Sequence, residues 1–208
     1  MATLNVLEYC RKNACHLIYA SSYIYGTPEY LPVDEKHPIK PFNPYAQSKA
    51  ICEQLCGGYN RDFGVKISIL RLFNVYGEGQ CGKLLLPEIL KQIKEGKTDI
   101  QLKSGSSRRD FVHVDDVARA FIACLDDRNG FSIYNVCSGQ SYSIRELTDI
   151  INAFCGNGLN FCFSESDRKM EVDETVGSYW RINKCLGWKP ELSLMDGIKK
   201  TITAELCI

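Results

Sequence analysis

The chain has 208 residues, of which 45% are hydrophobic, and its 25 basic side chains balance 25 acidic ones. Without a net charge it has no field that would favour nucleic acid or an anionic membrane, and its apolar runs are far shorter than the roughly 20 residues of a membrane span. The first residues also lack the basic and apolar regions of an export signal, so we expect a cytoplasmic protein that binds neither nucleic acid nor membrane.

Helices and strands alternate in the first part of the chain. A helix is predicted over 2–13 and a strand over 16–20. A proline-rich loop follows, and a helix is expected over 45–63. The apolar residues of that helix, spaced by four, are Ile51, Leu55, Tyr59 and Phe63. The apolar run over 65–73 predicts a strand buried on both faces, which favours a parallel sheet.

The second part continues the alternation with shorter elements. Ser143 and Glu146 have the spacing of a capping box, in which each side chain bonds the other residue's backbone N–H, and so mark a helix start. Helices are expected at 84–95, 115–125, 143–154 and 194–206, and strands at 100–102, 132–136 and 160–163. The sequence therefore predicts an α/β fold.

The cysteines do not form a recognisable pattern. There are eleven, an odd number, without any Cys-x-x-Cys, and the three histidines are isolated from one another. This usage is unlike a disulfide framework or a zinc site, so we expect buried thiols and no metal. Cys52, Cys56 and Cys124 are interpreted as small apolar residues on helix faces.

Tyr45 and Lys49 lie four residues apart at the start of the helix over 45–63. This spacing places both side chains on one helix face, where the ammonium would lower the phenol pKa from its usual ~10 and create an acid/base group. The alternative is a solvated surface contact. Ser21 follows the strand over 16–20, and the carboxyl ends of strands are where open α/β sheets bind ligands. Alternatively, Ser21 and Ser22 only satisfy backbone groups there.

Six motifs then occur in order along the chain. They are Ser21-Ser-Tyr-Ile-Tyr-Gly26, Asn43-Pro-Tyr-Ala-Gln-Ser-Lys49, Arg71-Leu-Phe-Asn-Val-Tyr-Gly77, Arg109-Asp-Phe-Val-His-Val-Asp-Asp116, Tyr134-Asn-Val-Cys-Ser-Gly139 and Leu186-Gly-Trp-Lys-Pro190. Together they resemble the extended short-chain dehydrogenase/reductases that act on nucleotide sugars, the NAD-dependent epimerase/dehydratase family that includes UDP-glucose 4-epimerases.

The resemblance implies roles for particular residues. Tyr45 would be the acid/base, Lys49 would hold the nicotinamide ribose, and Ser21 would be the catalytic hydroxyl that steadies the developing oxyanion. The cofactor would be NAD or NADP, contacted by Tyr45, Lys49 and Leu72. The substrate would be a nucleotide-diphosphate sugar, and its ligands would be Tyr23, Asn74, Leu85, Arg109, Arg168 and Glu171.

Departures from the family pattern narrow the expected reaction. Ser21-Ser22-Tyr23 stands where sugar dehydratases carry Thr-Asp-Glu, which disfavours a 4,6-dehydratase. The resemblance then implies a 4-epimerase, in which hydride leaves a sugar carbon and returns to its other face. The alternatives are a reductase or decarboxylase on the same scaffold, or a non-catalytic sugar-nucleotide-binding remnant.

Residues 77–82 spell the dinucleotide pattern G-x-G-x-x-G. We expect this segment not to bind pyrophosphate, because residues 74–76 separate it from the preceding strand and Pro87 follows closely. The resemblance assigns the glycine-rich turn to a leading βαβ unit, which we do not find in this sequence. The strand over 17–20 would then be an exposed edge.

The expected organisation is a partial Rossmann-type parallel sheet with a smaller mixed α/β substrate-binding subdomain. Residues 1–78 would form the incomplete dinucleotide-binding portion with the catalytic groups. Residues 79–208 would form the substrate-binding region, with about 111–136 returning to the Rossmann sheet. The resemblance also implies a homodimer through helices 2–13 and 45–63, in which Cys52 and Cys56 would permit close packing.

Overall fold

The computed structural model describes residues 2–82, 84–103, 105–164 and 172–206, so the predicted ligands Arg168 and Glu171 lie outside the described residues. The helices are α1 (Ala2–Asn13), α2 (Pro44–Phe63), α3 (Leu85–Lys94), α4 (Val114–Leu125), α5 (Ile144–Phe154), α6 (Trp180–Leu186) and α7 (Leu194–Leu206). The strands are β1 (Leu17–Ser22), β2 (Ile67–Leu72), β3 (Asn74–Tyr76), β4 (Asp99–Leu102), β5 (Arg108–Arg109), β6 (Phe111–His113), β7 (Phe131–Val136), β8 (Tyr142–Ser143) and β9 (Asn160–Phe163). The predicted α/β fold is confirmed.

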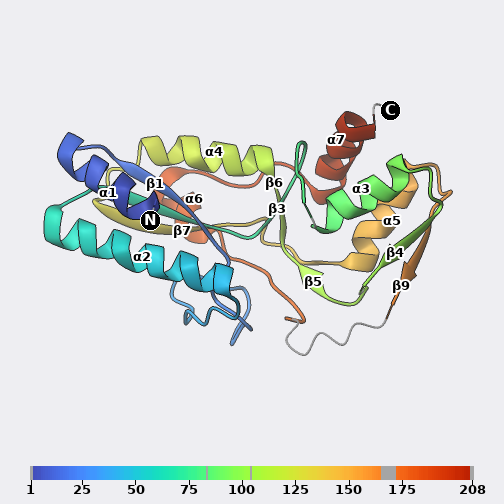
Figure 1. The fold of residues 1–208 in the computed structure, drawn as a ribbon, viewed down its shortest axis with the longest axis horizontal. Coiled ribbons are helices and arrows are strands. Elements are labelled where there is room, and N and C mark those ends of the chain that lie inside the picture. Colours follow the sequence, from blue (N-terminus) through green and yellow to red (C-terminus); the bar gives the residue numbers. More distant parts are fainter. Residues whose placement is uncertain (1, 83, 104, 165–171, 207–208) are drawn as a thin grey trace.

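A parallel sheet in the order β1-β2-β7 forms the centre of the first part of the molecule (Figure 1). Five of the six residues of β2 are buried, as the apolar run predicts for a central strand of a parallel sheet. Among the described residues β1 pairs only with β2, so its other side is an open edge.

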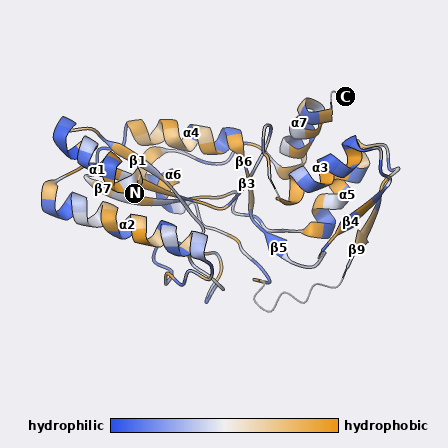
Figure 2. Cartoon of the chain, viewed as in Figure 1, coloured by the Kyte–Doolittle hydropathy of each residue, from blue (hydrophilic) through white to orange (hydrophobic). Residues whose placement is uncertain are grey.

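Helices cover both faces of this sheet. On one face, Leu7 of α1 and Cys56 of α2 pack with Ile67 and Ile69 of β2. On the other face, α4 and α6 pack with β2 and β7, and Figure 2 shows α4 as a largely hydrophobic helix. The sheet is therefore the middle layer of three.

The face that α2 turns inward differs from the predicted apolar stripe. Ile51 and Phe63 are 47% and 55% exposed. The residues that α2 buries are Ala46, Ala50, Glu53 and Cys56. These are mostly small side chains, which let the helix lie close to the strands, and one of them is charged.

Cys56 and Cys52 both serve contacts within the chain. Cys56 is fully buried in the cluster with Leu7 and Ile67, and the Cys52 thiol lies 3.3 Å from the Thr3 hydroxyl of α1. Cys56 therefore cannot contact a second copy, and the expectation that it allows close packing in a dimer is wrong, whereas for the partly exposed Cys52 it stays a prediction. Their interpretation as apolar residues on helix faces is confirmed for Cys56 and Cys124, which are fully buried.

The second part of the molecule has its own core. Side chains of α3, α5 and α7 pack against β4, which pairs in parallel with β9 (Figure 1). The capping box of Ser143 and Glu146 is present at the start of α5. The two-stranded pair of β3 and β6 lies between the two parts, an arrangement that the sequence did not predict.

Two negative findings concern the described residues only. None of their helices is long and apolar enough to cross a membrane. In the same part of the chain, no three histidine, cysteine or acidic side chains are grouped in a way that could hold a metal ion.

Candidate functional site

A cavity of about 330 Å³ opens at the carboxyl ends of β1 and β2. This is the edge at which open α/β sheets bind ligands. The predicted site residues in its lining are Ser21, Tyr45, Leu72, Asn74 and Leu85. They come from β1, α2, β2, β3 and α3, so the fold brings together segments that are up to 64 residues apart in sequence.

The start of α2 places Tyr45 at the mouth of this cavity. The Asn43 side chain accepts a hydrogen bond from the Ala46 backbone at 2.8 Å, and Pro44 occupies the first turn of the helix. Both are favoured at helix starts, since Asn accepts from a free N–H and proline has none to leave unpaired. Tyr45 is 59% exposed, so its phenol is accessible to a ligand.

Lys49 lies one helical turn after Tyr45. Its ammonium is 5.7 Å from the centroid of the Tyr45 ring and donates to the backbone oxygen of Ala20 at 2.8 Å. The lysine thus joins α2 to the end of β1 and places a positive charge beside the phenol ring.

Ser21 is hydrogen-bonded to a buried ion pair. Its hydroxyl donates to Glu53 Oε1 at 2.5 Å. Arg71 of β2 donates to the same carboxylate from Nε and Nη2, with the shortest distance 2.7 Å to Oε2. Burial acts to lower the pKa of Arg71, but its hydrogen bonds to Glu53 and Tyr25 outweigh this and the pKa is raised.

The network extends across the sheet through Tyr25. Arg71 Nη1 donates to the Tyr25 hydroxyl at 3.0 Å, and that hydroxyl donates to Asn135 Oδ1 at 2.5 Å. The Asn135 backbone N–H donates to Glu35 Oε1 at 2.7 Å. Burial raises the pKa of both Tyr25 and Glu35. A chain of polar contacts therefore runs beneath the candidate site from Ser21 to Glu35.

The pair of Glu53 and Arg71 was not predicted from the sequence. A signal was available, because Arg71 lies within a strand predicted to be buried on both faces and a buried charge requires a partner. Glu53 follows Lys49 by four residues and so lies on the same side of α2. What the sequence did not indicate is that Ser21 joins this pair.

Two predicted substrate ligands near the cavity already have partners. The Asn74 side chain donates to the backbone oxygen of Asp110 at 3.2 Å. Tyr23 lies outside the cavity lining, where its hydroxyl donates to Gly26 at 2.8 Å and its ring packs edge-on against Phe73. Burial raises the pKa of Tyr23 to about 12.

Arg109 lies on β5, outside the lining of the cavity. Its guanidinium donates to the backbone oxygens of Arg108 at 2.8 Å and Val172 at 2.6 Å. The side chain is half-buried, and the second of these bonds holds it against Val172. Its predicted role on a diphosphate stays a prediction.

Asp110 is a second buried carboxylate close to the site. It is fully buried and accepts four hydrogen bonds. They come from the backbone and hydroxyl of Ser138, both at 2.7 Å, and from the backbones of Gly139 and Gly177, both at 3.0 Å. Burial nevertheless raises the pKa of Asp110. No role was predicted for Asp110 from the sequence, yet it fastens two loops beside Asn74.

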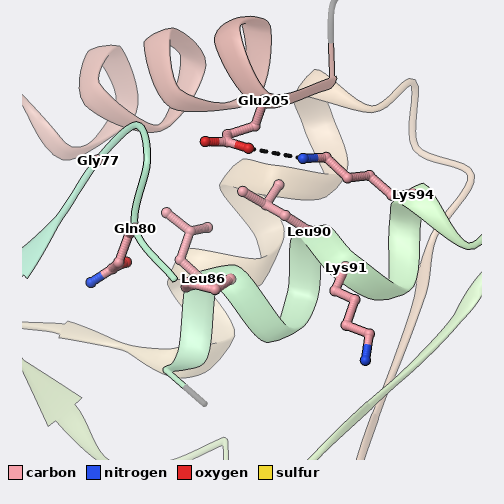
Figure 3. A pocket seen from close by; sticks show the side chains of 8 residues that line it. Gly77, Gln80, Leu86, Leu90, Lys91, Lys94 and Glu205 are labelled. Carbon is pink, nitrogen blue, oxygen red and sulfur yellow. Dashed lines mark hydrogen bonds and ion pairs between the residues drawn. The ribbon is translucent and has the colours of Figure 1, made fainter. Parts of the chain in front are cut away.

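The glycine-rich segment over 77–82 lies at another cavity, of about 250 Å³, between α3 and α7 (Figure 3). One ground for rejecting it as a dinucleotide turn is wrong, because residues 74–76 form β3 and Gly77 follows that strand directly. The rejection has other support. The Gly79 backbone N–H, which would have to face a phosphate, donates to Glu205 at 2.9 Å, and Glu205 also pairs with Lys94 at 2.8 Å.

Comparison with known proteins assigns the chain to a protein family. The model of the NAD dependent epimerase/dehydratase family matches residues 1–137. The chain belongs to this family. The resemblance drawn from the six motifs is thereby confirmed, and members of this epimerase/dehydratase family are NAD(P)-dependent enzymes that act on nucleotide sugars.

Two curated relatives differ in the reaction that their names describe. A putative UDP-glucose 4-epimerase of Methanocaldococcus jannaschii is 37% identical over 97% of this chain and 67% of its own length. The GDP-6-deoxy-D-mannose reductase of Pseudomonas aeruginosa is 30% identical over 98% of this chain and 70% of its own length. The chain thus spans about two thirds of these epimerase/dehydratase relatives.

Solved structures of the family match across almost the whole chain. The UDP-glucuronic acid 4-epimerase of Bacillus cereus, in complex with UDP-glucuronic acid and NAD, superposes with a TM-score of 0.87 at 26% identity. The superposed residues make up 99% of this chain and 66% of the epimerase chain. RMD from Pseudomonas aeruginosa, complexed with NADPH, gives 0.88 at 29% identity and covers 98% of this chain and 70% of that one. The Rossmann-type architecture is therefore confirmed.

Proposed function

We propose that the chain carries the catalytic groups and the sugar-nucleotide site of an NAD(P)-dependent nucleotide-sugar 4-epimerase. The observation that carries this proposal is the cavity at the carboxyl ends of β1 and β2, which Ser21, Tyr45, Leu72 and Asn74 line together. Tyr45 is accessible there, and the ammonium of Lys49 lies beside its ring.

The cavity suits the nicotinamide end of the family's cofactor. Tyr45, Lys49 and Leu72 would hold it, since Leu72 and the exposed Tyr45 border the cavity and the half-buried Lys49 lies beside the Tyr45 ring, so that the phenol and the ammonium can both bond a ribose diol. When bound, NAD(P) accepts a hydride from a sugar carbon and can return it. The dinucleotide's other end would need groups beyond those that we assign here.

In the proposed reaction Tyr45 handles the proton. As the phenolate it takes the proton of the sugar hydroxyl while the carbon loses its hydride, and it returns the proton after the sugar has turned. The positive charge of Lys49 stabilises the phenolate by charge attraction. Tyr45 and Lys49 together thus supply the acid/base group of the reaction.

The remaining predicted ligands would bind the rest of the nucleotide-diphosphate sugar. Asn74 and Leu85 border the cavity itself. Tyr23, Arg109, Arg168 and Glu171 complete the proposed set, with Arg109 at the diphosphate because its planar guanidinium fits phosphate oxygens. The division at residues 78 and 79, with about 111–136 returning to the sheet, remains our proposal for how the two halves share the work.

Replacement of Tyr45 tests the proposal most directly. Purified wild type and Tyr45→Phe would be assayed with UDP-glucose and NAD for conversion to UDP-galactose. Removing a general acid/base lowers kcat by about 10²- to 10⁴-fold, and we expect a dissociation constant for UDP-glucose that is little changed. The matched control is Tyr30→Phe, which removes an exposed phenol outside the cavity.

Two results would contradict the proposal. One is a Tyr45→Phe variant that turns over at the rate of the wild type. The other is a wild-type chain that neither binds nor converts UDP-sugars in calorimetry and product analysis. A chain that binds UDP-sugars but not NAD(H) would instead support the non-catalytic sugar-nucleotide-binding alternative.

A reductase is the second candidate function. The 30% identity with a GDP-6-deoxy-D-mannose reductase over 98% of the chain favours it. A reductase would oxidise NADPH in proportion to the 4-keto sugar nucleotide supplied, whereas an epimerase consumes no net cofactor. The decarboxylase alternative would release carbon dioxide from UDP-glucuronate, and the same product analysis detects it.

The proposal includes a cytoplasmic homodimer that packs through residues 2–13 and 45–63. The outer sides of α1 and α2 expose large apolar residues that could be covered in a dimer: Val6, Tyr9, Ile51 and Phe63. The ten cysteines that the structure describes are unpaired, which suits a reducing compartment. Light scattering that gives a monomer at micromolar concentration would contradict the dimer.

A further inference from the structure

The hydroxyl of Ser21 has a single proton, and Glu53 accepts it. The two oxygens are 2.5 Å apart, a distance typical of a strong hydrogen bond to a carboxylate. A serine hydroxyl offers one donor and two acceptor lone pairs. Because Ser21 also lines the cavity, it presents only its lone pairs to a ligand there.

Arg71 prevents Glu53 from turning away. The side chains of Arg71 and Glu53 are 2% and 6% exposed, and three donor contacts join the guanidinium to both carboxylate oxygens. If Glu53 rotated, a buried cation would lose its partner, which is strongly unfavourable in the protein interior. The ion pair therefore holds Glu53 as a carboxylate acceptor in front of Ser21.

We propose that Glu53, held by Arg71, is a positioning residue that fixes Ser21 as a hydrogen-bond acceptor for the reacting sugar hydroxyl. The proposal rests on the proposed function and deepens it. It differs from the role that the family resemblance implies, in which Ser21 donates to the developing oxyanion. The proton that leaves the sugar passes to Tyr45, while Ser21 keeps its own proton in the hydrogen bond to Glu53.

The arrangement distinguishes a hydroxyl from a ketone. A sugar hydroxyl can donate to Ser21, but a carbonyl oxygen has no proton to donate and receives none from Ser21. The substrate and the product therefore each donate a hydrogen bond to Ser21, and the keto sugar forms no hydrogen bond with it. Loose binding of the ketone suits an epimerase, in which the sugar must turn between the two hydride transfers.

Paired ligands can measure the direction of this hydrogen bond. The experiment uses the Tyr45→Phe protein, so that turnover stops and the phenol does not contribute, and compares UDP-glucose with UDP-4-deoxy-4-fluoroglucose by calorimetry. Fluorine can accept a hydrogen bond but cannot donate one. We expect the fluoro ligand to bind about tenfold more weakly, the effect of one lost hydrogen bond.

Two further variants in the same background assign the effect. With Ser21→Ala, we expect the two ligands to bind equally. With Glu53→Gln, the amide oxygen would face Arg71 and the amide nitrogen would face Ser21, which frees the serine proton. The fluoro ligand should then bind at least as well as UDP-glucose. Glu29→Gln, at a surface pair with Lys40, is the matched control and should keep the tenfold preference.

The outcomes separate the inference from the function. Equal binding of both ligands by Tyr45→Phe, or a tenfold preference that persists in Glu53→Gln, would overturn the inference and leave the proposed function intact. If Glu53→Gln does not fold by circular dichroism, a preference that persists in Ser21→Ala overturns it equally. Failure of the wild type to bind UDP-glucose, UDP-glucuronate or GDP-mannose overturns the proposed function itself.

Discussion

Glu53 and Asp110 are both buried acidic side chains beside the candidate site, but they are compensated in different ways. Glu53 faces a guanidinium from β2, supplemented by the hydroxyl of Ser21. Within the part of the chain that the structure describes, the donors to Asp110 are a hydroxyl and three backbone N–H groups, and none of them is a cation. One site depends on a single charge, and the other distributes its compensation over several neutral donors.

Glu53 and Asp110 therefore stabilise different parts of the fold. The pair of Glu53 and Arg71 joins α2 to the central strand β2. Removal of either residue leaves the charge of the other one buried without a partner. Asp110 instead fastens loops, and each of its donors can be lost separately. We therefore expect an all-or-none response at Glu53 and a graded response at Asp110.

Arg71→Met should give the largest effect. It leaves Glu53 buried without its cation, and we expect a loss of about 3–5 kcal/mol in the free energy of unfolding, measured by urea denaturation. The control is Glu53→Leu combined with Arg71→Met, in which both charges are gone and most of the loss should be recovered. A loss below about 1 kcal/mol for Arg71→Met would contradict the comparison, because that is the range of exposed pairs.

Asp110→Asn should give a smaller loss, of about 2–4 kcal/mol. The amide keeps the shape of the side chain but turns one acceptor oxygen into a donor that faces other donors. Unfolding in urea measures the loss. A wild-type stability would show that the four bonds contribute nothing beyond packing.

Ser138→Ala is the graded control for this prediction. It removes only the hydroxyl bond and leaves the three backbone donors to Asp110, so we expect a loss of about 1 kcal/mol. A loss as large as that of Asp110→Asn would contradict a distributed compensation.

Much of the fold could be predicted because its signals are local. The largely apolar run that includes β2 favours burial on both faces, and the capping box of Ser143 and Glu146 fixes the start of α5. Three-residue strands such as β3 and β6 carry too little periodicity to be recognised, and they pair across more than thirty residues. Because β3 was not recognised, residues 74–76 were wrongly expected to separate Gly77 from the preceding strand.

The inward face of α2 could not be predicted from hydropathy. The apolar stripe through Ile51 and Phe63 matched a helical period, but the side that approaches the sheet consists of small residues and Glu53. A glutamate appears hydrophilic in any sequence pattern. It is buried here only because Arg71 lies opposite it on β2.

The sequence by itself determined the order of the longer helices and strands, the family, and the segments that supply Ser21, Tyr45, Lys49 and Asn74, because motifs and periodicity are properties of neighbouring residues. Only the tertiary structure decided that Ser21, Tyr45 and Asn74, with Leu72, border one cavity and that Ser21 gives its proton to Glu53. The direction of a hydrogen bond depends on which partners the fold brings within 3 Å or so, and residues 32 positions apart meet only when α2 packs on the sheet.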